Sequence, residues 1–344
     1  MITFTPVARW IWGRDDETSD PLFCCLRHLL VAYGVLGEHR FAVGDPKMSI
    51  SVAEAGKSNS FLFQEEFRVG SWHPNGVAQL VDRVRGRLRT GEIGSVDGYV
   101  ECAGMVMVGS GDEEVQQESL FRLSASSFAD FVSVELSANS DVWLAYDLEG
   151  RPQQKVYAAN APRLSALLCD LSQSLGVETD PDDPTYFAKP TQTGVENYFD
   201  SDGKASDVWR SFEVPTRYDV FTHAPGFGKI GYQRAARGEV RCVAVRDQQG
   251  ELLGHLWASD SENAASFEPQ DVSDDATYRA GLVWLDRLRS AHDRGLSPCE
   301  ALAELGDLPD GEDDAGRVDL SEELTIPLAR LRDGSQQGSA QGSL

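Results

Sequence analysis

The sequence predicts an α+β fold in which largely antiparallel sheets are flanked by amphipathic helices, arranged in two domains. Several segments carry apolar residues at helical spacing and have capping residues at their ends. The segments that alternate like strands come in groups and not one per helix, which favours antiparallel over parallel pairing. With 344 residues, the chain is long enough for two or more domains.

Three helices are expected in the first part of the chain. The clearest one should have Asn160 as its N-cap and end at Gly176, because the residues between them form one apolar stripe. That stripe consists of Leu164, Leu167, Leu168, Leu171 and Leu175. A second helix is expected over residues 21–33, with Asp20 as its N-cap, and a third over residues 75–88.

The same region, expected to form a domain of residues 1–178, also contains strand-like segments. Residues 131–136 and 142–148 alternate apolar and polar side chains on either side of a turn-like segment, 137–140. This pattern predicts a hairpin. Further strands are expected at 47–52, 60–69, 98–108 and 115–123.

The composition changes over residues 179–207, which are rich in Pro, Asp, Thr and Gly. This change predicts a linker or a long surface loop. A second domain, residues 208–306, should follow it. Its strands are expected at 219–224, 239–246 and 251–258, the last two joined as a hairpin by a loop that ends in Gly250.

Two helices complete the predicted second domain. A long amphipathic helix should run from about residue 274 to 294 and end at Gly295. After it, Ser297 and Glu300 have the spacing of a capping box, in which each side chain bonds the backbone of the other residue. A short helix is therefore expected to begin there and to stop at Gly306.

Acidic side chains dominate the composition, with 55 Asp and Glu against 31 Lys and Arg and a formal net charge of -24. They are dense in residues 310–323, part of a segment, 307–344, that ends in a Gly/Ser/Gln tail. That tail has too little apolar material to fold, so it should be mobile unless a partner orders it. Whether the acidic residues 310–323 are ordered is left open. The charge also disfavours direct nucleic-acid binding, which depends on clustered Lys and Arg.

The sequence shows no long apolar stretch, no secretory leader pattern and no C-x-x-C pair among its six cysteines. A cytoplasmic protein with reduced thiols and no membrane contact is therefore expected.

Short motifs that could carry chemistry stand in the wrong context. Residues 226–231 satisfy G-x-G-x-x-G without a predicted helix after them, and residues 51–58 resemble a phosphate-binding loop that lacks its first glycine. Cys24 and His28 lie four residues apart on a predicted helix, so they could act as a metal pair or as a nucleophile and its base. No third ligand is visible near them in the sequence, so no metal site, cofactor or catalytic residue is predicted.

The sequence Ser-Asp-Val-Trp occurs twice, at 140–143 and 206–209, and an aromatic residue and an acid follow each copy. The two copies are either a duplication or a coincidence. We expect partner contacts around them, because aromatic side chains anchor interfaces and acids attract basic partners. The expected contact residues are Asp141, Trp143, Tyr146, Asp207, Trp209 and Phe212.

These observations favour a non-enzymatic binding protein whose acidic surface engages a basic protein partner. An immunity-type inhibitor of a cationic toxin fits this description. Two alternatives stay open. One is an enzyme that acts on a small molecule at a site assembled from distant residues, with His73 or His223 as candidates. The other is an accessory component of a bacterial protein assembly.

Overall fold

The computed structural model describes residues 1–3, 5–16, 20–68, 76–109, 111–223, 231–306 and 315–338. The chain divides into two compact units, Met1–Phe212 and Glu213–Leu344. The paired strands of both units are antiparallel, which confirms the predicted α+β class.

The first unit is built on one large sheet. Its strands are β1 (Ala8–Asp15), β2 (Lys47–Glu54), β3 (Lys57–Arg68), β4 (Ile93–Val108), β5 (Glu113–Phe128), β6 (Phe131–Ala138) and β7 (Asp180–Pro181). They lie in the order β3-β2-β4-β5-β6-β1-β7. The other elements are α1 (Pro21–Glu38), α2 (Gly76–Arg85), α3 (Gln154–Leu175) and a separate hairpin of β8 (Ala188–Thr191) and β9 (Gly194–Asn197).

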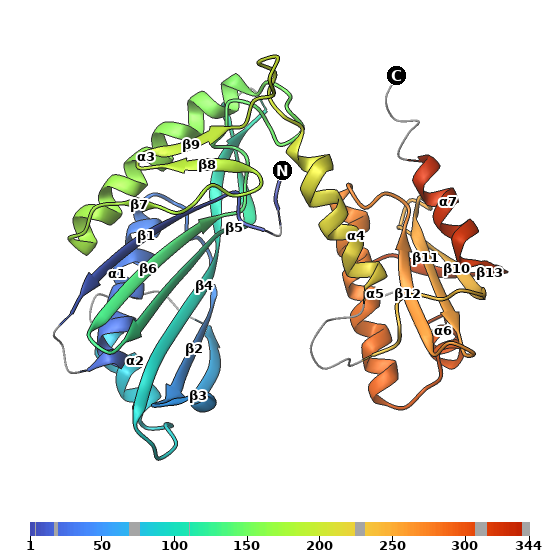
Figure 1. Ribbon diagram of the computed structural model, residues 1–344, viewed down its shortest axis with the longest axis horizontal. Coiled ribbons are helices and arrows are strands. Elements are labelled where there is room, and N and C mark those ends of the chain that lie inside the picture. The colour runs from blue at the N-terminus through green and yellow to red at the C-terminus, as the bar shows by residue number, and fades with distance from the viewer. Residues whose placement is uncertain are drawn as a thin grey trace. The chain divides into compact units, whose positions relative to one another are not determined.

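Helices α1 and α3 cover one face of this sheet (Figure 1). Side chains along β4 and β6 alternate between buried and more exposed positions, as expected for strands with a single covered face. At the covered face, Phe41 meets Phe121 and Trp143 edge-on, with ring centroids 5.5 and 5.4 Å apart. These contacts place Trp143 in the core.

Helix α1 begins where the sequence predicts. The Asp20 side chain accepts a hydrogen bond from the Phe23 N–H at 3.2 Å, which confirms its role as the N-cap. By length and composition α1 could cross a membrane, but 61% of its apolar window is buried inside the protein. Its contacts with β4, β5 and β6 make it a core helix of this unit.

Helix α3 begins at Gln154, so the prediction of Asn160 as its N-cap is wrong. Asn160 is buried inside the helix, where its amide accepts from the Met107 N–H at 2.9 Å and donates to the Met107 C=O at 2.8 Å. Met107 lies in the part of β4 that extends beyond its pairing with β2. The Asn160 amide therefore bonds backbone groups that β2 does not reach. At the other end, Gly176 adopts φ +68°, as expected for a C-terminal glycine.

The predicted strand at 142–148 is also wrong. This segment forms turns, and β6 pairs with β5 and β1 instead. Side-chain hydrogen bonds stabilise the turns: Asp141 accepts from the Leu148 N–H at 3.3 Å, and the Gln153 amide donates to the Asp141 C=O at 2.6 Å. The backbone polar groups are therefore satisfied without a partner strand.

Residues 179–207, expected to be a linker or a long surface loop, belong to the first unit and contain β7, β8 and β9. Strand β7 pairs with β1. The Thr185 hydroxyl donates to the Val7 C=O at 2.8 Å, and the Trp10 indole donates to the Thr191 C=O at 2.8 Å. These long-range bonds attach the Pro- and Asp-rich segment to the sheet.

The second unit follows η1 (Trp209–Glu213), a π-helical turn at which the two units meet in the sequence. Its strands are β10 (Glu239–Arg246), β11 (Leu252–Ser259), β12 (Ala264–Pro269) and β13 (Arg317–Pro327), and its helices are α4 (Val214–Thr222), α5 (Asp275–Asp293), α6 (Pro298–Gly306) and α7 (Leu328–Gly338). The sheet order is β12-β11-β10-β13.

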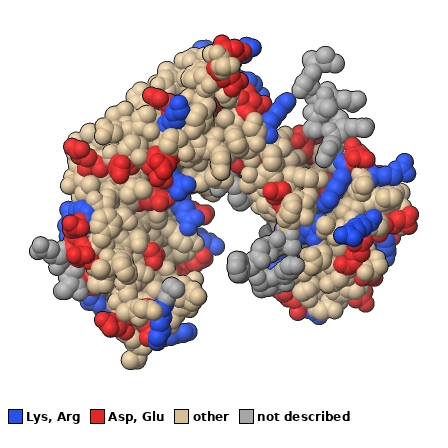
Figure 2. Space-filling model, in the orientation of Figure 1, with Lys and Arg blue, Asp and Glu red and all other residues tan. Residues whose placement is uncertain are grey.

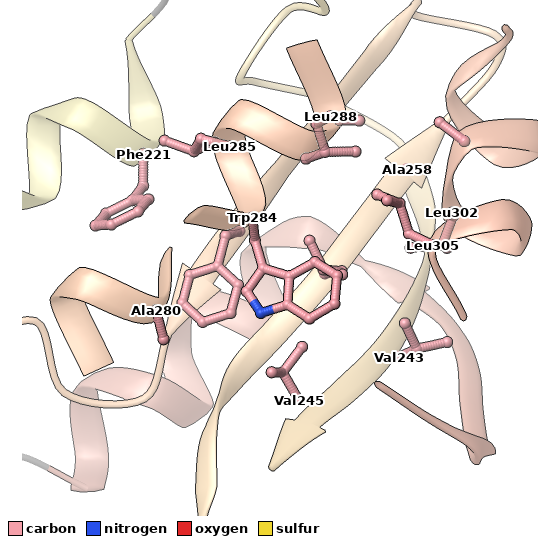
Figure 3. Close-up of a cluster of buried hydrophobic side chains, with 14 of the residues drawn as sticks. Phe221, Val243, Val245, Ala258, Ala280, Trp284, Leu285, Leu288, Leu302 and Leu305 are labelled. Carbon is pink, nitrogen blue, oxygen red and sulfur yellow. The ribbon is translucent and has the colours of Figure 1, made fainter. Parts of the chain in front are cut away.

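This smaller sheet is covered on both faces. Figure 3 shows Trp284 of α5 in the core formed with α6 and the sheet, near Phe221 and Leu288. On the other face, Leu328 and Leu331 of α7 belong to a cluster around the buried Trp257. The sheet therefore lies between two apolar layers, which explains why nearly all side chains of β11 and β12 are buried.

Several predictions for this unit are confirmed. Strands β10 and β11 form the expected hairpin, with Gly250 at φ +87°. The long helix expected from about residue 274 to 294 is α5, and the Asp274 side chain caps its start by accepting from the Thr277 N–H at 2.7 Å. The capping box forms as well: Glu300 accepts from the Ser297 N–H at 2.8 Å, and Ser297 accepts from the Glu300 N–H at 3.4 Å.

The strand predicted at 219–224 is wrong, because most of this segment lies in α4. Arg217 and Phe221, one helical turn apart, are both buried. The Arg217 guanidinium donates to the buried Glu213 carboxylate at 3.0 Å and lies 2.7 Å from the Asp275 carboxylate. This charged network links α4 to α5. The alternation of residues 219–224 gives no sign of it.

The structure describes part of the acidic segment. Residues 307–314 and 339–344 lie outside the described residues, but the acidic residues from 317 onward form β13, the fourth strand of the sheet. Glu323 lies 2.6 Å from Arg241 and Glu322 lies 2.8 Å from Arg246, both on the neighbouring β10. The segment therefore pairs with basic residues of its own chain.

Candidate functional site

A hollow of about 640 Å³ opens on the first unit, among the segments that follow β7 and β9. We call it the aromatic groove. Its lining residues come from four short stretches: Thr185 and Tyr186; Tyr198, Phe199 and Asp200; Ser206, Asp207 and Val208; Ser211 and Phe212.

Three aromatic side chains of this groove are unusually exposed. Tyr186 is 67% exposed, Phe199 55% and Phe212 39%. Tyr186 stacks on Phe212 with ring centroids 5.0 Å apart, and Phe199 meets Tyr146 edge-on at 5.8 Å. Clustered exposed aromatic rings are typical of binding surfaces, because a partner that covers them removes their apolar area from water.

Hydrogen bonds hold the walls of the groove in place. The Tyr198 hydroxyl donates to the Thr185 C=O at 2.8 Å, and burial raises the pKa of Tyr198, so the hydroxyl keeps its proton. Asn197 joins the segment of Tyr146 by two bonds, accepting from the Tyr146 N–H at 3.1 Å and donating to its C=O at 2.8 Å. The groove is therefore preformed by backbone contacts between distant segments.

The charged groups among the described lining residues are both carboxylates, Asp200 and Asp207. The Asp200 carboxylate accepts from the Ser206 hydroxyl at 2.5 Å. Asp207 lies 3.7 Å from Arg210, a long and exposed ion pair of small energetic value. Asp207 Oδ1 also accepts from the Arg210 N–H at 3.0 Å, so both carboxylates are held in place at the groove.

The structure places the six predicted contact residues in two groups. Asp207 and Phe212 line the aromatic groove, and Tyr146 packs against its Phe199. The other three are buried inside the first unit: Asp141, Trp143 and Trp209. Asp141 forms an ion pair with the amino group of Met1 at 2.6 Å.

Tyr186 and Phe199 were not among the predicted contacts. Both belong to Tyr-Phe pairs in a segment rich in Pro, Asp and Gly. In the first pair, Phe187 is buried while Tyr186 is exposed. Aromatic pairs within a polar segment are thus the signal in the sequence that could have located the groove.

A second constellation forms around Cys24 and His28, for which the sequence showed no third ligand. The structure supplies one: the Cys24 thiol donates to the Asp16 carboxylate at 3.0 Å and lies 3.7 Å from His28 Nδ1. One donor atom from each residue lies within 4.8 Å of the other two. Burial and the Asp16 carboxylate raise the pKa of Cys24 to about 12, which argues against an activated thiolate nucleophile.

The other motifs give no comparable site. His223 is 76% exposed and lies 3.3 Å from Asp219 on the same helix. Residues 51–58 comprise the end of β2, the two-residue turn and the start of β3, so they form no strand-to-helix loop. His73 and residues 226–230 lie outside the described part of the chain.

A second hollow, also of about 640 Å³, lies beside the end of α3. Hydroxyl and amide side chains make up much of its lining, including Ser172, Gln173 and Thr179, and none of its described lining residues is aromatic. The aromatic groove combines exposed rings with carboxylates, so it is the better candidate for a binding site.

Comparisons of the chain with protein families, with curated proteins and with solved structures give no match in any of the three. The geometry and charge of the aromatic groove are therefore the basis on which a function can be assigned.

Proposed function

We propose that this chain is a binding protein that docks a basic segment of a protein partner in the aromatic groove. The observation that carries this proposal is the pairing of exposed aromatic rings with the Asp200 and Asp207 carboxylates in one hollow. A guanidinium group fits both features, because it stacks on aromatic faces and donates paired hydrogen bonds to carboxylates.

The aromatic rings would provide most of the affinity. Tyr186 and Phe199 are the most exposed rings of the groove, so a partner that covers them removes a large apolar area from water. Because their segments are already fixed by the bonds of Tyr198 and Asn197, little conformational order has to be gained on binding.

The overall charge would contribute mainly to the rate of encounter. A formal net charge of -24 attracts cationic proteins over a distance of several ångströms, and this attraction weakens as salt is added. An immunity-type inhibitor of a cationic toxin is the biological role that we favour on this ground. Such a role predicts a salt-sensitive complex and a basic toxin encoded next to this protein.

A peptide of alternating Arg and Gly, carrying a fluorophore, tests the docking site on the full chain. Fluorescence anisotropy at low salt should show binding that Tyr186→Ala and Phe199→Ala each weaken by about tenfold. Asp207→Asn should weaken it by about threefold and reduce its salt dependence, since one carboxylate is lost. A Lys-Gly peptide should bind less tightly, because an ammonium group cannot stack as a guanidinium does.

Two matched controls separate the groove from general attraction. Phe128, the last residue of β5, is 65% exposed, so Phe128→Ala removes a comparable ring elsewhere on the unit. Asp286 is an exposed carboxylate of α5, and Asp286→Asn removes the same charge as Asp207→Asn. Equal binding by all variants, or no binding by the parent protein, would overturn the proposal.

A further inference from the structure

We infer that Asp16, Cys24 and His28 form a binding site for a transition-metal ion of the zinc type in the first unit. The three residues offer a carboxylate oxygen, a thiol sulfur and an imidazole nitrogen, the three donor types found in zinc sites. This site is separate from the aromatic groove, and its existence does not depend on the function proposed for the groove.

The distances between the donors suit a tetrahedral ion. With metal–ligand distances of about 2.0 to 2.3 Å, two ligands of a tetrahedral zinc ion lie about 3.3 to 3.7 Å apart. Cys24 Sγ lies 3.0 Å from Asp16 Oδ2 and 3.7 Å from His28 Nδ1, and all three donors lie within 4.8 Å of one another. His28 Nδ1 also lies 2.8 Å from the Cys24 C=O, so the imidazole would have to give up this hydrogen bond for Nδ1 to bind the ion.

Two rigid elements hold the donors. Cys24 and His28 are one turn apart on α1, whose start is fixed by Asp20. Asp16 follows β1, and its N–H donates to the Asp130 C=O at 2.6 Å, next to the paired residues of β1 and β6. Cys24 and His28 are buried, and the Asp16 side chain is only 10% exposed.

The charged neighbours of the site act in both directions. The Cys24 thiol donates to the Asp16 carboxylate, and the Arg14 guanidinium lies 3.6 Å from the same carboxylate oxygen. A divalent ion would replace the thiol proton, whereas the Arg14 and Arg27 cations would weaken its binding. Burial lowers the pKa of His28, so the imidazole is neutral, as a ligand must be.

The donor set indicates which ions would bind. Sulfur and nitrogen donors favour zinc and its transition-metal neighbours, whereas calcium and magnesium prefer oxygen ligands alone. Three protein donors leave a fourth position, which water can fill.

Cobalt(II) serves as the probe, because cobalt bound to a thiolate gives a charge-transfer absorption band that an ion bound to oxygen alone lacks. Titration of the full-length protein should produce this band at one equivalent, and zinc should abolish it by competition. Cys24→Ser should lose the band, and Asp16→Asn and His28→Gln should each weaken cobalt binding by at least about tenfold. Cys169→Ser removes the exposed cysteine and should leave the band unchanged.

Circular dichroism checks the fold of each variant. If Cys24→Ser does not fold, the test relies on Asp16→Asn, which keeps the shape of the side chain. The inference is overturned if the parent protein shows no band, if Cys169→Ser loses it, or if Asp16→Asn binds cobalt as tightly as the parent. Binding of the Arg-Gly peptide should be unchanged in Asp16→Asn, so the two proposals can fail separately.

Discussion

Burial sets the protonation state of two histidines in this protein. The pKa of His255, on β11, is lowered by burial first and by the Arg246 cation second, and burial likewise lowers the pKa of His28. Both imidazoles therefore resist protonation in the folded state. Neither effect is visible in the sequence, because burial depends on how distant segments pack.

Stability should consequently fall in mild acid. Below the ordinary histidine pKa of 6.5, the unfolded chain takes up a proton at residue 255 more readily than the folded protein does, so lower pH favours unfolding. Urea midpoints measured from about pH 7.5 to about pH 5.5 should decrease, and His255→Gln should make this decrease smaller. His223→Gln, at an exposed position, should keep the parent slope. An unchanged slope in His255→Gln would contradict this account.

Single residues also show where prediction from sequence stops. Trp143 and Tyr186 are both large aromatic residues near acids, yet Trp143 is in the core and Tyr186 is exposed. The pair of Cys24 and His28 follows from helical spacing, whereas Asp16 joins them only because β1 ends next to α1 in space. Local spacing predicts neighbours on one element and cannot predict neighbours from another.

At the scale of elements, Asn160 connects a helix to a strand. Its amide bonds both backbone groups of Met107, so the Asn160→Ala protein would leave an N–H and a C=O of β4 without these partners. We expect a loss of about 2 kcal/mol in the free energy of unfolding. Urea denaturation measures this, and Gln173→Ala, at an exposed position of the same helix, should change stability by less than about 0.5 kcal/mol. Equal stability of Asn160→Ala and the parent would contradict the structural role.

Elements whose signals are local were predicted well. The N-cap Asp20, the capping box at Ser297 and the hairpin glycine Gly250 all lie where the sequence places them. The wrong or missing elements depend on distant partners. Strand β13 is acidic and pairs along its backbone with β10, whose arginines meet two of its acids, while β1 lies between β6 and β7 in the sheet.

For the whole molecule, the surplus of acids does not by itself define a binding surface. Acids outnumber bases in each of the two units. Figure 2 shows acidic side chains spread over both units, with basic ones among them. The sequence therefore predicts attraction to basic partners but not the place of contact. The aromatic groove supplies a place, because it combines carboxylates with rings that folding leaves exposed.

Photo-crosslinking of an Arg-Gly peptide to the full-length protein tests the central claim most directly, since it locates the contact. After digestion, mass spectrometry should find most crosslinks within residues 185–212, and Phe199→Ala should reduce them strongly. Crosslinks distributed over acidic sites of both units, with no effect of Phe199→Ala, would contradict the claim that the aromatic groove is the docking site.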